Sequence, residues 1–145
     1  MRTRGRDLAI QYETFEHEAD IGIRGFGSSM EEAFENAAAA MYSVMVNIER
    51  ISPTEKRRLS VTAPDYELLL VEWLNALLAL SDVERMVFNR FEVKIDGMAL
   101  SGIAWGEGLD HARHEPKVEV KGATYHMLSV KKEYERHVAQ CVVDV

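Results

Sequence analysis

Residues 66–80, YELLLVEWLNALLAL, decide the fold, because a helix of this sequence is apolar on almost every side. Leu69, Trp73 and Leu77 follow one stripe at helical spacing, and further leucines widen the stripe around the helix. Asp65 precedes this segment and is a residue type that caps helix N-termini. A helix this apolar must be covered on most sides, so we expect residues 66–80 at the centre of the core.

A hairpin is predicted after this helix, in residues 91–100, FEVKIDGMAL, where apolar and polar residues alternate. The pair Asp96-Gly97 is a strong two-residue turn signal. Closing the hairpin at this pair places Ile95 opposite Met98 and, further along, Val93 opposite Leu100. Gly102 is expected to mark a β-bulge in the returning strand.

A second helix is predicted after Ser28 and Ser29, with an outer face that carries Glu31, Glu32 and Glu35 and no base. We expect this acidic face to be exposed, either solvated or docked on a basic partner. Alternating patterns predict strands at residues 12–16, 21–27, within 48–63 and at 137–145, and residues 106–116 read as a polar loop.

The size and composition fit one globular domain, since 145 residues contain 47% hydrophobic and 28% charged residues. We expect a flexible leader at residues 1–10 and a single domain at residues 11–145. Acidic residues outnumber basic ones 24 to 17, which argues against direct binding of bare nucleic acid. Neither a membrane-spanning run nor a signal peptide is evident, and the single cysteine excludes an internal disulfide, so a cytoplasmic protein is expected.

The sequence shows no phosphate loop, no GxGxxG and no GxSxG motif. Cys141 lies among valines and is predicted to be a buried, inert thiol. His111 and His114 are expected to face solvent in a loop rather than to bind zinc, because no spacing rule holds them. His17 and His126, like His137, are expected to be hydrogen-bonded structural residues.

Carboxylates offer a different chemistry at the end of the chain. Asp144 stands beside Val145, and Asp20 lies in a short connection between two predicted strands. If Asp20 reaches that end, three carboxylates converge and form an oxygen-only site that suits Ca²⁺ or Mg²⁺. The alternative is a chain end that frays into water.

Six segments in order resemble the archease family. They are HEADIGIRGFG (17–27), SSMEEAFENAAAAMYSVM (28–45), YELLLVEWLNALL (66–78), GEGLD (106–110), KGATYH (121–126) and VVDV (142–145). Two positions depart from the family pattern, since Glu18 stands where Thr is usual and Gly122-Ala123 replaces the commoner Ala-Val. Neither change removes a ligand position.

The resemblance implies an α+β fold, with a mostly antiparallel multi-stranded β-sheet packed with two long α-helices, and the element pattern above agrees. It also implies a non-catalytic accessory protein of the GTP-dependent RtcB-type RNA ligase. Such a protein promotes ligase guanylylation and multiple turnover in tRNA splicing and RNA repair, and it meets tRNA only through the ligase. No membrane partner is expected.

The resemblance further implies a bound divalent metal, usually calcium, with magnesium or another cation as alternatives. Its ligands, carried over, are Asp20, Asp144 and Val145, the last through a main-chain or terminal oxygen. Lys121, Glu107 and His17 are candidates for supporting roles. Two competing interpretations are a general chaperone or adaptor for RNA-modifying enzymes and a metal-dependent hydrolase, for which the sequence offers no clear nucleophile partner.

Overall fold

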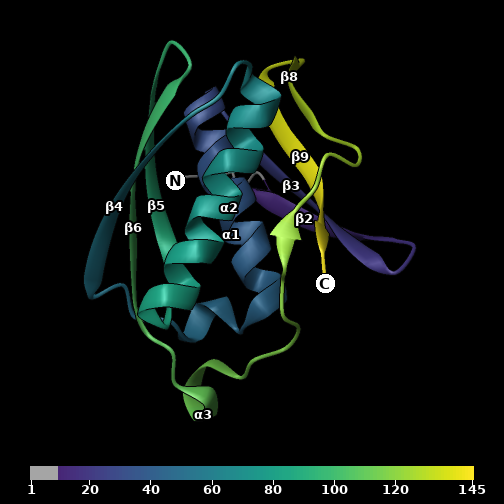
Figure 1. Cartoon of the computed structure of the whole chain (residues 1–145). Helices are drawn as coiled ribbons and strands as arrows, with labels where there is room; N and C mark the ends of the chain where they lie inside the picture. The colour runs from purple at the N-terminus through teal and green to yellow at the C-terminus, as the bar shows by residue number, and fades with distance from the viewer. Residues whose placement is uncertain (1–9) are drawn as a thin grey trace.

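The computed structural model describes residues 10–145 and arranges them in three layers, with two helices between two β-sheets (Figure 1). The predicted leader lies outside the described residues, apart from the exposed Ile10. The α+β class and the antiparallel strands are confirmed, but the strands form two sheets where one was expected. Two sheets follow from the apolar helices, because a helix layer that is apolar on both sides needs a cover on both sides.

The five-stranded sheet contains both ends of the predicted domain. Its main order is β2 (Tyr12–His17), β3 (Asp20–Gly27), β9 (Arg136–Asp144) and β7 (Gly122–Ala123), and β8 (Ser129–Glu133) also pairs with β9. Every pairing is antiparallel. Since β9 lies between β3 and the strands β7 and β8, the last strand of the chain is an interior strand of this sheet.

The three-stranded sheet has the order β4 (Glu55–Thr62), β6 (Ala99–Gly108) and β5 (Met86–Asp96). Ahead of β4, residues Ile48–Arg50 form a short 3-10 helix, η1, where a strand was expected. Among residues 10–145, no helix is long and apolar enough to cross a membrane.

Both long helices begin where the sequence predicts. Helix α1 (Met30–Met45) is capped by Ser29, whose Oγ accepts a hydrogen bond from Glu32 N at 3.1 Å. Helix α2 (Tyr66–Glu84) is capped by Asp65 and continues four residues beyond the expected end at residue 80. It ends at Arg85, which adopts a left-handed conformation with φ of 55°.

Trp73 of α2 joins the helix layer to the three-stranded sheet. Its buried indole donates from Nε1 to Phe34 O of α1 at 3.1 Å and lies against Gly102 of β6. A Cβ added at Gly102 would lie 2.4 Å from the Trp73 ring, so this glycine admits the indole and does not mark the predicted bulge. The bulge of this sheet lies instead between Phe88 and Arg90 of β5.

The predicted hairpin forms, but its turn lies one residue later in the sequence than expected, so each residue pairs two positions away from its predicted partner. Asp96 pairs with Ala99, and Ile95 pairs with Leu100, so the turn residues are Gly97 and Met98. Gly97 has φ of 62°, which suits a turn with glycine at its first central position. The Asp-Gly pair was therefore assigned to the wrong turn positions.

The prediction that Glu31, Glu32 and Glu35 form an exposed acidic face on α1 is wrong at Glu35. Its Oε2 accepts a hydrogen bond from Val93 N of β5 at 2.9 Å, because α1 packs against β5 as well as β3. Burial raises the pKa of the Glu35 carboxyl, although the bond from Val93 opposes that shift. Of the three glutamates, only Glu32 is exposed.

Residues 106–116, predicted as a polar loop, contain a partly buried polar cluster around Glu107. The Glu107 carboxylate accepts hydrogen bonds from Arg113 Nη2 at 2.7 Å, Ser52 N at 2.8 Å and His114 Nε2 at 2.8 Å. His114 Nδ1 accepts from Asp110 N at 2.9 Å, which leaves Nε2 as the donor. The expectation that His114 faces solvent is wrong, since its side chain is fully buried and holds helix α3 (His111–His114) to β6.

Gly102→Ala should destabilise the protein, because the new methyl group would displace the Trp73 ring. We expect a loss of about 1–3 kcal/mol, the usual cost of overpacking a filled core. Urea unfolding monitored by tryptophan fluorescence measures it. Gly108→Ala, in the same strand, is the matched control, because a Cβ there meets nothing within 4 Å. Equal stability of the two variants would contradict this assignment.

Glu107→Gln should destabilise the protein near neutral pH. Burial alone would raise the pKa of the Glu107 carboxyl, but the bonds from Arg113, Ser52 and His114 outweigh it and lower the pKa to about 2. A carboxyl with a depressed native pKa stabilises the fold above its unfolded pKa and loses this effect as the pH falls towards the native value. The difference from wild type should be greatest near pH 7, on the order of 1–3 kcal/mol for lost charged hydrogen bonds, and shrink below about pH 4.5. Urea unfolding across this range tests it, and a pH-independent difference would refute the assignment.

Candidate functional site

The candidate site lies where β3 begins and β9 ends. Ile21 pairs with Val143, so Asp20 and Asp144 are the next residues on two adjacent strands. Val145 N donates a hydrogen bond to Asp20 Oδ1 at 3.3 Å. The segment that opens the predicted domain and the segment that closes it therefore meet at one edge of the five-stranded sheet, near the C-terminus marked in Figure 1.

Both aspartates belong to the outer face of the sheet. Ile23 and Cys141 pair with each other, and both are fully buried on the face that α1 covers. Since side chains alternate along a strand, Asp20 and Asp144 point to the opposite face. Asp20 is half-buried, Asp144 is exposed and Val145 is half-buried, so solvent reaches the two carboxylates.

Oxygen atoms make up the donor set at this edge. Within residues 10–145, no group of three or more His, Cys, Asp or Glu side chains is placed to hold a metal ion. A cation between Asp20 and Asp144 would thus need a main-chain or terminal oxygen of Val145 as a further ligand. Two carboxylates with such an oxygen are ligands that hard divalent cations accept, and water completes their coordination.

Two of the three supporting candidates lie beside these aspartates. His17 pairs with Asp20 across the β2–β3 hairpin. Lys121 N donates to Asp144 O at 2.7 Å, while the Lys121 residue is exposed. Glu107 does not join them, because it lies in the other sheet and its carboxylate is held by Arg113, Ser52 and His114.

The sequence interpretation missed one contact at this edge. The rings of His17 and His126 lie 5.9 Å apart between centroids, at an interplanar angle of 44°. His126 follows β7 and its carbonyl oxygen accepts a hydrogen bond from Val142 N at 3.0 Å. The only sequence signal was that His17 begins and His126 ends a segment resembling the same family, and nothing in the spacing linked the two.

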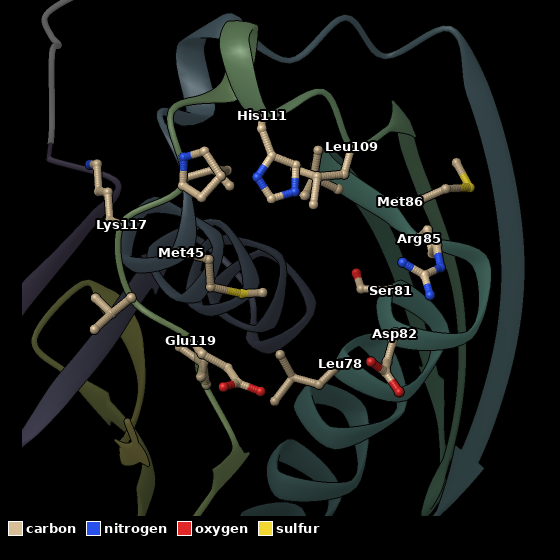
Figure 2. A pocket seen from close by; sticks show the side chains of 15 residues that line it. Met45, Leu78, Ser81, Asp82, Arg85, Met86, Leu109, His111, Lys117 and Glu119 are labelled. Carbon is tan, nitrogen blue, oxygen red and sulfur yellow. The ribbon is translucent and has the colours of Figure 1, made fainter.

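A separate cavity of about 650 Å³ lies between the C-terminal ends of α1 and α2 and the segment at residues 109–120 (Figure 2). Met45, Leu78 and Met86 contribute apolar walls, and charged groups such as Asp82 and Glu119 stand around it. Ser81, which lines it, shares a hydrogen bond of 2.5 Å with Tyr42 Oη. This cavity has the size of a small-molecule site but shares no residue with the aspartate edge.

The predicted inert thiol is confirmed. Cys141 is fully buried, and burial raises the pKa of its thiol to about 12. Nearly all of it is therefore protonated at neutral pH, so Cys141 is a core residue rather than a nucleophile.

Comparison with known proteins places the chain in a family. The archease protein family model matches residues 12–145. Proteins named archease from Pyrococcus abyssi and Sulfurisphaera tokodaii are 46% and 41% identical, over 140 and 137 residues, and each match covers 93% of this chain and 99% of the relative.

Solved structures agree with this placement. The solution structure of protein 1598 from Methanobacterium thermoautotrophicum matches with a TM-score of 0.82 and 36% identity, covering 93% of this chain and 99% of that one. A crystal structure of an archease from Thermotoga maritima shares the fold with a TM-score of 0.60 and 21% identity, over 92% and 96% of the two chains. On the family model and the curated relatives together, this chain belongs to the archease family.

Proposed function

We propose that this protein is an accessory factor of a GTP-dependent RNA ligase of the RtcB type, with a divalent cation bound by Asp20, Asp144 and Val145. It promotes guanylylation of the ligase and repeated turnover in tRNA splicing and RNA repair. The observation that carries the proposal is the hydrogen bond from Val145 N to Asp20 Oδ1, which joins two segments that both lie within the match to the family model.

The chemistry of the site supports a binding role rather than catalysis by this chain. The donors are two solvent-accessible carboxylates with a main-chain or terminal oxygen, and Lys121, whose backbone N bonds to Asp144 O, is an exposed base. A hard cation held there supplies a positive centre that attracts a phosphate or carboxylate of the ligase. Asp20 and Asp144 hold that cation, and Lys121 stands beside them to contact the same anionic group.

A general chaperone for RNA-modifying enzymes is the second candidate. It is favoured by the Thermotoga maritima structure, which is described as a possible chaperone. A chaperone keeps its client soluble and does not need the two aspartates for any chemical step. The two functions therefore differ in whether ligase activation depends on Asp20 and Asp144.

Asp20→Asn and Asp144→Asn should each weaken calcium binding about tenfold or more, because each change removes one negative charge from the donor set; this corresponds to about 1.4 kcal/mol. Titration calorimetry with Ca²⁺ and with Mg²⁺ measures both affinities. Asp82→Asn is the matched control, because Asp82 is an exposed aspartate on α2 and far along the chain from either ligand. Equal calcium affinity in all four proteins would rule out this site.

Asp144→Asn should also impair activation of the ligase. In a single-turnover assay, the wild-type protein and Asp82→Asn should increase the rate of ligase guanylylation by GTP, and Asp144→Asn should increase it much less. Light scattering of the ligase, recorded in parallel, detects any chaperone effect. If Asp144→Asn activates as well as wild type and suppresses ligase aggregation, the chaperone function is correct and the metal-dependent one is wrong.

A further inference from the structure

The three-stranded sheet has one covered face and one open face. Leu59, Leu100 and Val93 lie on the face that α2 and Trp73 cover. The residues between them point to solvent, and we call these positions the open face. It comprises Lys56, Arg58, Ser60 and Thr62 of β4, Ala99, Ser101, Ile103 and Trp105 of β6, and Arg90, Glu92, Lys94 and Asp96 of β5.

Basic residues dominate the charge of the open face, although acids outnumber bases in the whole chain. Its four bases are accompanied by only two acids, Glu92 and Asp96. Within the part of the chain that the structure describes, the four bases form no ion pair. Arg57, which points to the covered face, is paired with both Glu55 and Glu84. The outward bases therefore remain available to an external anion.

The strand register places an aromatic ring between two of these bases. Lys56, Trp105 and Arg90 lie opposite one another across the three strands. The Arg90 guanidinium lies over the indole of Trp105, with Cζ 4.5 Å from the ring centroid. Trp105 is half-buried, so an apolar surface and a planar cation are both presented to solvent at one end of the face.

A shallow depression of about 280 Å³ lies on the open face beside this aromatic end. Arg58 and Lys94 stand on opposite sides of it and outnumber the one acid of its lining, Glu92. Ser60, Ser101 and Ile103 also contribute to the lining. The face thus offers cations at both edge strands and hydroxyl groups between them. An anionic chain that crosses the strands meets positive charge at each edge.

We propose that the open face binds single-stranded RNA, with phosphates at Arg58, Lys94 and Lys56 and a base stacked on the Arg90–Trp105 pair. Single-stranded RNA offers both phosphates and planar bases, and proteins read it by stacking on aromatic rings and guanidinium groups. An acidic protein segment offers the anions but no planar group to match the aromatic end. The net charge of the whole chain, which argues against direct binding of bare nucleic acid, does not describe how charges are distributed between its faces.

The test measures binding of the purified protein, without ligase or metal, to a fluorescently labelled single-stranded RNA of about 12 nucleotides. Fluorescence anisotropy should give a dissociation constant that rises with salt, with a logarithmic slope of about 0.7 for each phosphate contact. Arg58→Gln combined with Lys94→Gln should reduce that slope by about 1.4. Trp105→Leu should weaken binding about tenfold and leave the slope unchanged.

Lys131→Gln combined with Lys132→Gln is the matched control, because it removes two exposed bases from β8 in the other sheet. The control should bind RNA as wild type does. Arg58 and Lys94 are exposed, so their replacement leaves the core intact, and a thermal melt verifies folding of each variant.

Absence of RNA binding at low salt, or an equal loss of binding in the control variant, would overturn the proposal. Stronger binding of a polyglutamate peptide than of RNA would also overturn it, in favour of an acidic protein partner. Because the ligase is absent, none of these outcomes depends on the function proposed above.

Discussion

The contact between Trp73 and Gly102 is the constraint on which the layered structure depends. The indole enters the three-stranded sheet only where β6 has no side chain, and its Nε1 is fixed by Phe34 O of α1. One residue of α2 therefore sets the distance between a sheet and both helices. The buried ring also removes a large apolar area from water. The same contact therefore fixes how the layers pack and stabilises the fold.

Glycine has a related role in the other half of the core. A Cβ on Gly25 of β3 would lie 2.2 Å from Ala37 N of α1, so the helix backbone approaches the strand directly. Alanines at Ala33 and Ala37 keep this side of α1 small. The close approach fixes β3 under the helix, and β3 in turn aligns β9 so that Asp144 arrives beside Asp20.

Local signals in the sequence predicted the parts of the fold that depend on local interactions. The caps Ser29 and Asp65 and the stripe around Trp73 located both helices, because capping and amphipathic periodicity involve residues a few positions apart. Glu35 and His114 were misjudged because their partners, Val93 and Glu107, are brought to them only by tertiary packing. The hairpin register was predicted wrongly because glycine suits more than one position of a two-residue turn. Gly97 takes the first central position here, with Met98 as the second. The proximity of Asp20 to residues 144–145 was a hypothesis based on charge and on the family resemblance. The periodicity of apolar residues could not have predicted it, because it describes only local structure.

The hydrogen bond between Val145 and Asp20 closes a span of 125 residues, so it belongs to the least local contacts of the molecule. Closing a loop of such length costs chain entropy, which the contacts of the intervening strands and helices must offset. The hairpin β2–β3 can form early, but its aspartate has no partner until β9 is inserted between β3 and the strands β7 and β8. A ligand that needs both Asp20 and Asp144 binds only fully folded molecules. Its binding therefore shifts the folding equilibrium towards the folded state. An incompletely folded molecule would not bind that ligand. The fraction of molecules that bind it therefore equals the fraction in which β9 is in place.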